Sequence, residues 1–199
     1  VFQSVLGISW FWFLGSVYVA QLPNFTKLTL GGGEHVITLL LTLFAVGIGA
    51  GSLLCERMSG HKVELGLVPF GSIGLTVFGV DLFFATPVSP PVGGESLGAL
   101  IFLSQPGSWR IVLDVVSIGV FGGFFIVPLY ALVQQRSEPS HLSRVIAGNN
   151  ILNAVFMVTA AIIAVVMLNL GLSIPQLLLL MAIFNAAVAV YIFGLVPEF

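Results

Sequence analysis

Long apolar runs separated by short polar stretches make up almost all of this 199-residue chain. A helix needs about 20 mainly apolar residues to cross about 30 Å of hydrocarbon, and six runs are long enough. Alternating segments of about ten residues, which are typical of a membrane β-barrel, are absent. The pattern predicts an all-α membrane protein with six transmembrane helices, at about residues 5–22, 36–55, 63–85, 111–133, 145–168 and 174–196.

Small residues recur at helical spacing inside two of these runs. Gly47 and Gly51 are four residues apart, and so are Gly119 and Gly123. Glycines at this spacing leave a groove along one helix face that lets another helix approach closely. We therefore expect both runs to take part in close helix packing.

The connections between the runs differ in charge. Loops on one side of the membrane carry Arg57, Lys62, Arg136 and Arg144, and loops on the other side carry Lys27 and Arg110. Lys and Arg accumulate on the cytoplasmic side, so we expect both termini of this segment to be cytoplasmic. In one outer loop, "ESLGALIFLSQ" (residues 95–105) is either a short helix on the membrane surface or an ordered loop with apolar anchors.

Composition agrees with a membrane protein and excludes several other classes. Charged residues make up 7% of the chain and hydrophobic residues 58%, whereas charged residues are about a quarter of a soluble domain. The formal charge of −2 and the lack of basic clusters argue against a nucleic-acid partner. Cys55 is the only cysteine and the three histidines are far apart, so we expect no disulfide framework and no metal site. The absence of an initiator Met suggests a piece of a larger protein.

Asp114 is the strongest candidate for chemistry within a span. A charge at mid-membrane costs about 2.5–3.5 kcal/mol on insertion scales, so it is a functional candidate by default. Asp114 follows Arg110 by one helical turn, and this spacing predicts an ion pair. Asp114 either neutralises an interfacial Arg110 or faces a water-filled cavity as a headgroup or proton site. Asp81, near the outer end of the third span, is interpreted as interfacial.

Three asparagines open the fifth span. Asn149, Asn150 and Asn153 are close enough in helical register to share a face, and carboxamides suit either a polar lining or interhelical hydrogen bonds. Asn185 and Gln3 are weaker candidates. No Ser-His-Asp order, phosphate-binding loop or HExxH motif is present. We therefore expect neither enzyme activity nor a cofactor on this chain.

The most polar passage, "GSLLCERMSGHKVE" (residues 51–64), resembles a loop signature of the major facilitator superfamily. That signature runs loosely Gly-x-Leu-x-Asp-Arg-x-Gly-Arg-Arg. The matching positions here are Ser52, Leu54, Glu56, Arg57, Ser59 with Gly60, and His61 with Lys62. The family carries a degenerate copy in its second half, so the resemblance implies helices seven to twelve, built as two three-helix repeats. The implied partner is the N-terminal six-helix half of the same transporter.

A closer resemblance rests on "GISWFWFLGSVYVAQLPNFTK", "GIGAGSLLCERMSGHKVELGLVPFGSIG" and "RVIAGNNILNAVFMV". These segments resemble the lysophospholipid transporter family, and also the transporter-like domain that some bacteria fuse to a 2-acylglycerophosphoethanolamine acyltransferase and an acyl-carrier-protein synthetase. The resemblance implies movement of lysophosphatidylethanolamine or lysophosphatidylglycerol across the bacterial inner membrane for re-acylation. Membrane lipid and the acyltransferase and acyl-carrier-protein machinery are the implied partners. A proton-coupled exporter of small molecules and a non-transporting anchor for a fused acyltransferase are the alternatives.

The resemblance also implies positions for a substrate cavity and a gate. In the resembled fold the first, second, fourth and fifth helices of this half face the cavity, and the third and sixth are peripheral. The implied cavity residues are Asp114, Ser117, Asn149, Asn150 and Asn153, with Thr38 and Trp10 in the wall. The implied gating loop contains Glu56, Arg57 and Lys62, which would contact the other half. The alternative for these charges is that they only fix topology and cap helices.

Overall fold

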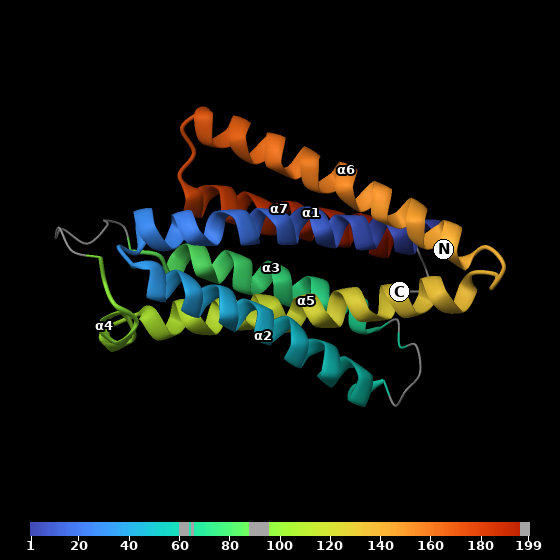
Figure 1. The fold of residues 1–199 in the computed structure, drawn as a ribbon, viewed down its shortest axis with the longest axis horizontal. Coiled ribbons are helices and arrows are strands. Elements are labelled where there is room, and N and C mark those ends of the chain that lie inside the picture. Colours follow the sequence, from blue (N-terminus) through green and yellow to red (C-terminus); the bar gives the residue numbers. More distant parts are fainter. Residues whose placement is uncertain (60–63, 65, 88–95, 196–199) are drawn as a thin grey trace.

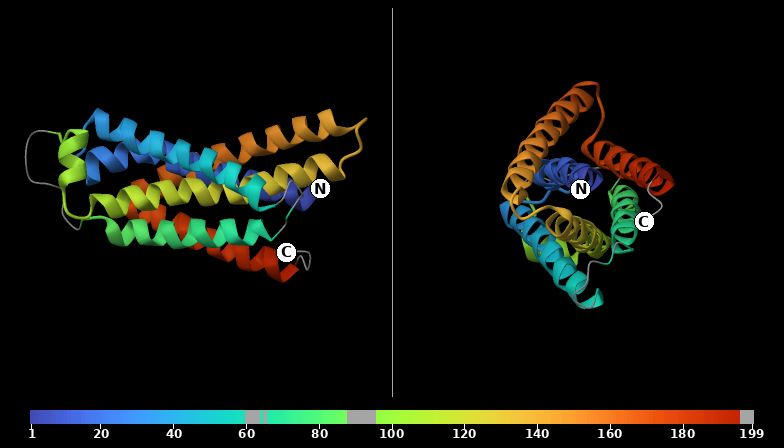
Figure 2. Two further views of the ribbon diagram at one scale, coloured as in Figure 1. Left: turned by 90° about the horizontal axis from the view of Figure 1, so that it is seen from below. Right: turned by 90° about the vertical axis from the view of Figure 1, so that its right-hand side faces the viewer.

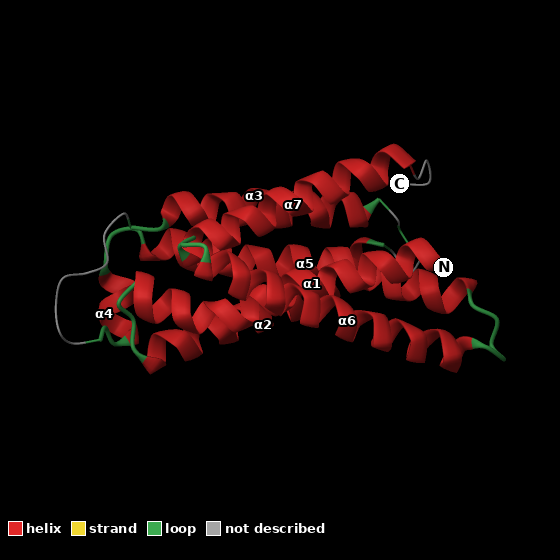
Figure 3. Ribbon diagram, turned by 90° about the horizontal axis from the view of Figure 1, so that it is seen from above, coloured by secondary structure: helices red, strands yellow, loops and turns green. Residues whose placement is uncertain are grey.

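The computed structural model describes residues 1–59, 64, 66–87 and 96–195, with the backbone alone for 192–195. Within these ranges the chain is helical, and six long helices run lengthwise between two ends that hold the connections (Figures 1 and 3). Each is long and apolar enough to cross a membrane. The predicted all-α membrane fold with six transmembrane helices is confirmed. The helices are α1 Phe2–Asn24, α2 Glu34–Met58, α3 Leu67–Ala85, α5 Ser108–Arg136, α6 Leu142–Asn169 and α7 Ile174–Leu195.

Helix α3 begins four residues later than the hydrophobic pattern suggested, at Leu67 rather than near residue 63. Pro69 lies in its first turn, where its missing N–H is not needed. An earlier start would place the proline ring against the carbonyl of residue 65. Pro69 therefore fixes where the helix begins.

Two short elements lie at the end of the bundle away from the termini. The π-helix η1 (Phe25–Thr29) continues α1 directly and begins two residues after Pro23. The helix α4 (Ala99–Ser104) falls within the segment that the sequence left open between a helix and a loop. The loops are joined here by a short parallel bridge, in which the Gly33 N–H donates to the Leu97 carbonyl at 2.8 Å and the Leu97 N–H donates to the Gly31 carbonyl at 2.9 Å.

Helix α5 lies at the centre of the bundle and packs against α1, α2 and α3. Its approach to α2 depends on two glycine pairs that face each other, Gly47 and Gly51 on α2 and Gly119 and Gly123 on α5. A Cβ atom on Gly51 would lie 2.0 Å from the Val120 carbonyl oxygen, so no side chain fits there. The close packing expected from the glycine spacing is confirmed.

The remaining helices pair on either side of this centre. Helix α6 packs mainly on α1, and α7 packs mainly on α3, as the end-on view shows (Figure 2). Helix α6 buries only one narrow stripe, formed by Asn149, Asn153, Ala160 and Ala164. These residues recur at helical spacing and so share one face. The other faces of α6 carry exposed apolar side chains.

Candidate functional site

A groove of about 800 Å³ runs along the middle of the bundle between α1, α2, α5 and α6. Helix α1 forms its floor with eight of the lining positions, and α2 and α6 lie on either side of α1 (Figure 2, right). The lining is apolar apart from four uncharged polar residues, Trp12, Ser16, Gln21 and Tyr130. A groove of this kind suits an apolar or amphiphilic ligand rather than a small ion.

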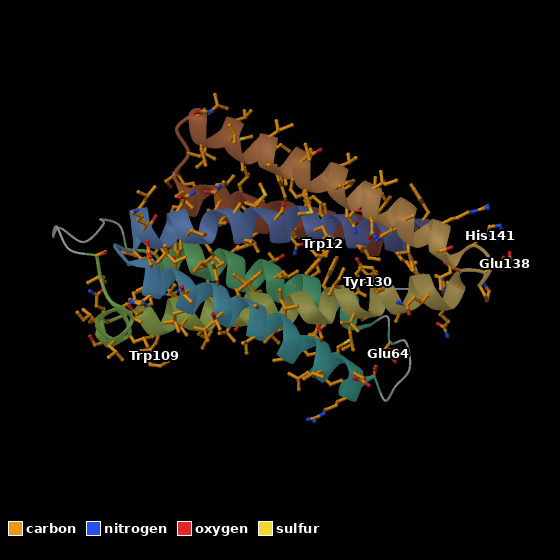
Figure 4. All side chains as sticks on the ribbon, in the orientation of Figure 1. Trp12, Glu64, Trp109, Tyr130, Glu138 and His141 are labelled. Carbon is orange, nitrogen blue, oxygen red and sulfur yellow. The ribbon has the colours of Figure 1, made fainter. Side chains whose placement is uncertain are left out.

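The polar groups of the groove lie at two levels. The Trp12 indole N–H donates to the Tyr130 hydroxyl at 3.2 Å, linking α1 to α5 (Figure 4). Gln21 lies nine residues further along α1, about 14 Å along the helix axis at 1.5 Å per residue. Its Oε1 atom is buried and accepts no hydrogen bond from any described residue. Gln21 therefore carries an unpaired acceptor that is closed off from the groove in this conformation, and Ser16 uses its hydroxyl on the Phe13 carbonyl at 2.8 Å.

The three asparagines of α6 do not act together. Asn153 is buried and its Oδ1 accepts a hydrogen bond from the Ser9 hydroxyl at 2.8 Å, which joins α6 to α1. Asn149 is also buried, and its Oδ1 has no hydrogen-bond partner among the described residues. Asn150 is exposed. Of the two roles that the sequence left open, interhelical bonding is the one seen at Asn153.

Trp10 belongs to a buried polar network rather than to the groove. Its indole N–H donates to the Asn185 Oδ1 at 3.0 Å. The Asn185 amide nitrogen donates in turn to the Ser72 carbonyl at 2.9 Å and to the Thr76 hydroxyl at 3.0 Å. This network joins α1, α7 and α3, and its centre is Asn185, which the sequence marked only as a weak candidate.

The ion pair expected between Arg110 and Asp114 is wrong, because Arg110 pairs with Asp81 on α3. The Arg110 Nε atom donates to the Asp81 Oδ2 at 2.9 Å, and its Nη2 group bonds the other carboxylate oxygen. Both side chains are partly exposed, as expected for an interfacial Asp81. Asp114 is 0% exposed and points into the protein. The Arg110 side chain instead extends to the surface, where the Asp81 carboxylate accepts two hydrogen bonds from it. Ser117, two residues before Gly119 on α5, is half-buried.

The other predicted site residues lie at the two ends of α2. Thr38 is exposed and borders a separate shallow depression beside α4, together with His35. Glu56 and Arg57 are exposed in the last turn of α2, and Lys62 lies outside the described residues. In the described part of the chain, no group of three His, Cys, Asp or Glu side chains could hold a metal ion.

The polar residues of the groove were not predicted from the sequence. Trp12 has the same local surroundings as Trp10 in "WFWF", yet Trp12 lines the groove and Trp10 does not. Gln21 carried a usable signal, since it is the only amide side chain in the second half of α1 apart from Asn24 at its end.

Six membrane-spanning helices around an apolar groove define a polytopic α-helical membrane protein. The chain is similar to the lysophospholipid transporter LplT of Yersinia enterocolitica, with 31% identity over 150 residues that cover 74% of this chain and 31% of the relative. It is equally similar to LplT of Yersinia pestis strain Pestoides F, covering 30% of that relative. The chain thus spans about a third of the length of these curated relatives. No protein-family model matches the chain, and no solved structure matches it.

Proposed function

We propose that this chain is part of a lysophospholipid transporter. In this proposal the whole protein moves lysophosphatidylethanolamine or lysophosphatidylglycerol across the bacterial inner membrane for re-acylation. The observation that carries the proposal is the 31% identity over 150 residues to curated lysophospholipid transporters. The relatives bear the names of transporters, which agrees with a chain that catalyses no reaction itself.

The groove is chemically suited to such a lipid. A lysophospholipid has one acyl chain and a polar headgroup, so it needs a long apolar wall with a few polar contacts. The groove has such a wall, and Gln21 and the hydrogen-bonded Trp12–Tyr130 pair are polar residues in its lining. Because no charged residue in the described part of the chain lines the groove, we infer that this chain holds mainly the acyl chain, and that charges elsewhere in the protein contact the phosphate.

The helix arrangement supports a half-transporter of the major facilitator kind. Two three-helix repeats, α1–α3 and α5–α7, predict that α2 packs on α5 and that α6 packs equivalently on α1. Both contacts are made. The contact between α3 and α7 joins the third helix of each repeat. The exposed apolar faces of α6 would then cover or border an N-terminal six-helix half.

The charge distribution supports an orientation. Arg57, Arg136 and Arg144 lie at the end of the bundle that holds the termini, and Lys27 and Arg110 lie at the α4 end. By the positive-inside rule the end with the termini is cytoplasmic. Glu56, Arg57 and Lys62 would then form a cytoplasmic gating loop that contacts the other half. Exchanging Glu56 for Gln in the full-length protein should shift its balance between inward-open and outward-open states, and unchanged accessibility of the inner face would contradict this role.

Two glycines on neighbouring helices allow a matched test of the groove. A Cβ atom on Gly15 or on Gly49 would meet nothing within 4 Å, but only Gly15 lines the groove. We expect Gly15→Trp in the full-length protein to fill the groove and reduce the delivery of labelled lysophosphatidylethanolamine to the inner leaflet of spheroplasts. Gly49→Trp should leave delivery unchanged.

The proposal is tested first with the unmodified full-length protein. If spheroplasts with and without it deliver the labelled lipid equally well, lysophospholipid transport is excluded. If the protein delivers lipid but Gly15→Trp delivers as much as Gly49→Trp, transport stands and the groove is not the path.

A further inference from the structure

A buried carboxyl group lies beside a surface ion pair at the α4 end of the bundle. Asp114 is in the second turn of α5 and is 0% exposed. Neither of its carboxyl oxygens accepts a hydrogen bond from a described N–H or O–H donor, and the Asp81 carboxyl group lies close enough to share a proton with it. One turn earlier on the same helix, Arg110 forms its two hydrogen bonds with Asp81 of α3. The proposed function uses Arg110 only for orientation and gives no role to Asp81 or Asp114.

The surroundings of Asp114 favour its neutral form. A buried ionised carboxylate without a partner is strongly disfavoured, and such groups take up a proton instead. Arg110 lies one turn before Asp114 on α5, and the Asp81 carboxylate is bonded to Arg110. Asp81 opposes a second negative charge nearby, and the guanidinium of Arg110 is already engaged by Asp81.

Other titratable groups on the helices around α5 lie away from this pair or are exposed. Helix α2 carries Glu34 and His35 in its first turn, and both are exposed. Helix α4 contains no titratable residue. The only titratable side chain of α1 is Tyr18, which lines a small cavity with Phe44 and Gly122 further along the bundle. Among the described residues, Arg110 is therefore the cation available to an ionised Asp114.

We propose that Asp114 is a proton-binding site, and that loss of its proton transfers Arg110 from Asp81 to Asp114. The i, i+4 spacing on α5 puts Asp114 within reach of the Arg110 side chain. In the protonated state Arg110 ties α5 to the end of α3. In the deprotonated state the pair lies within α5, and the link to α3 is released. Proton binding at a buried site is thereby coupled to the contact between two helices.

Infrared difference spectroscopy on the full-length protein tests the proton site. The spectrum of the wild type minus that of Asp114→Asn at neutral pH should contain the C=O band of a protonated carboxylic acid. The band should disappear as the pH is raised. If no such band is present at neutral pH, Asp114 is ionised and the proposal is overturned.

Two further variants test the exchange of partners. In Asp81→Asn, Arg110 is freed to pair with Asp114, and the neutral-pH band should fall, because an adjacent guanidinium typically makes a carboxyl group about 10- to 1,000-fold more acidic. In the double variant Asp81→Asn/Arg110→Gln the band should return, because no cation is left. A band that stays low in the double variant would show that loss of the Asp81 charge alone ionises Asp114, and would overturn the exchange.

If Asp81→Asn does not give a monodisperse protein, the single variant Arg110→Gln tests the exchange of partners instead. Without its guanidinium, the Asp114 band should persist to a more alkaline pH than in the wild type. Disappearance of the band at the same pH in both proteins would overturn the exchange of partners.

Discussion

The close backbone contact between α2 and α5 can be tested by adding a single carbon atom. Gly51→Ala places a Cβ 2.0 Å from the Val120 carbonyl oxygen and 2.7 Å from its carbonyl carbon. Both atoms belong to the α5 backbone, so no change of rotamer relieves the clash. Gly49→Ala, two residues away on the same helix, meets nothing within 4 Å.

The two variants should differ in stability, because they share one effect on the helix and only one of them creates a clash. Both variants replace a helical glycine by alanine, and this replacement stabilises a helix by up to about 1 kcal/mol. Only Gly51→Ala must move α2 away from α5, because Cβ atoms in proteins essentially never lie within 3.0 Å of a backbone atom of a neighbouring helix. A gap of about 0.5–1 Å loses a quarter to a half of the dispersion energy of the atoms facing it, and overpacking costs about 1–3 kcal/mol. We therefore expect Gly51→Ala to be less stable than Gly49→Ala by about 1–3 kcal/mol.

Cys55 provides a local probe of this contact. It is one turn after Gly51 on α2, is 2% exposed, and packs against Leu67 and Phe124. Reaction with a maleimide that fluoresces on thiol addition, followed during heating or titration with sodium dodecyl sulfate, reports the separation of α2 from α5. Mass spectrometry of the labelled peptide assigns the signal to Cys55.

Gly51→Ala should expose Cys55 at a lower temperature or detergent fraction than the wild type. Gly49→Ala should match or exceed the wild type. Equal midpoints for the two variants would refute the inference that the glycines are required by close backbone contact.

Three smaller predictions concern polar side chains within the helices. A double-mutant cycle on Ser9→Ala and Asn153→Ala should give a coupling energy of about 0.6 kcal/mol and at most about 1.7, measured by the same unfolding titration. Asn150→Ala should change the unfolding free energy by less than about 0.5 kcal/mol, because the side chain is exposed. Asn185→Ala should destabilise by about 1–3 kcal/mol by leaving the Trp10 indole N–H and its other partners unpaired, with a matching change in tryptophan fluorescence.

The number and type of helices could be predicted from the sequence because both follow from local composition. A run of about 20 apolar residues has few alternatives to a transmembrane helix. The glycine pairs were also readable, since spacing along one helix determines which residues share a face. Even the misplaced start of α3 has a local cause in Pro69, whose effect on the preceding turn can be read from the sequence.

The partners of the polar side chains depend on how each helix is rotated against its neighbours. Arg110 had an acidic residue at ideal spacing on its own helix, yet it bonds Asp81, which is 29 residues away in the chain. Trp10 and Trp12 are two residues apart in α1, and they project toward α7 and α5 respectively. Local pattern does not contain this information, because it arises only when the helices assemble.

The contact between α2 and α5 has a consequence for how the protein is made. Gly119 follows Gly47 by 72 residues, so the glycine-lined face of α2 has no α5 to pack against until the later helix has been synthesised. At about 5–20 residues per second this delay is about 4–14 s. During that time bilayer lipid or the insertion machinery must cover a face shaped for a helix backbone. In the interval between the insertion of α2 and that of α5, other glycine-rich helices can therefore compete with α5 for the glycine-lined face of α2.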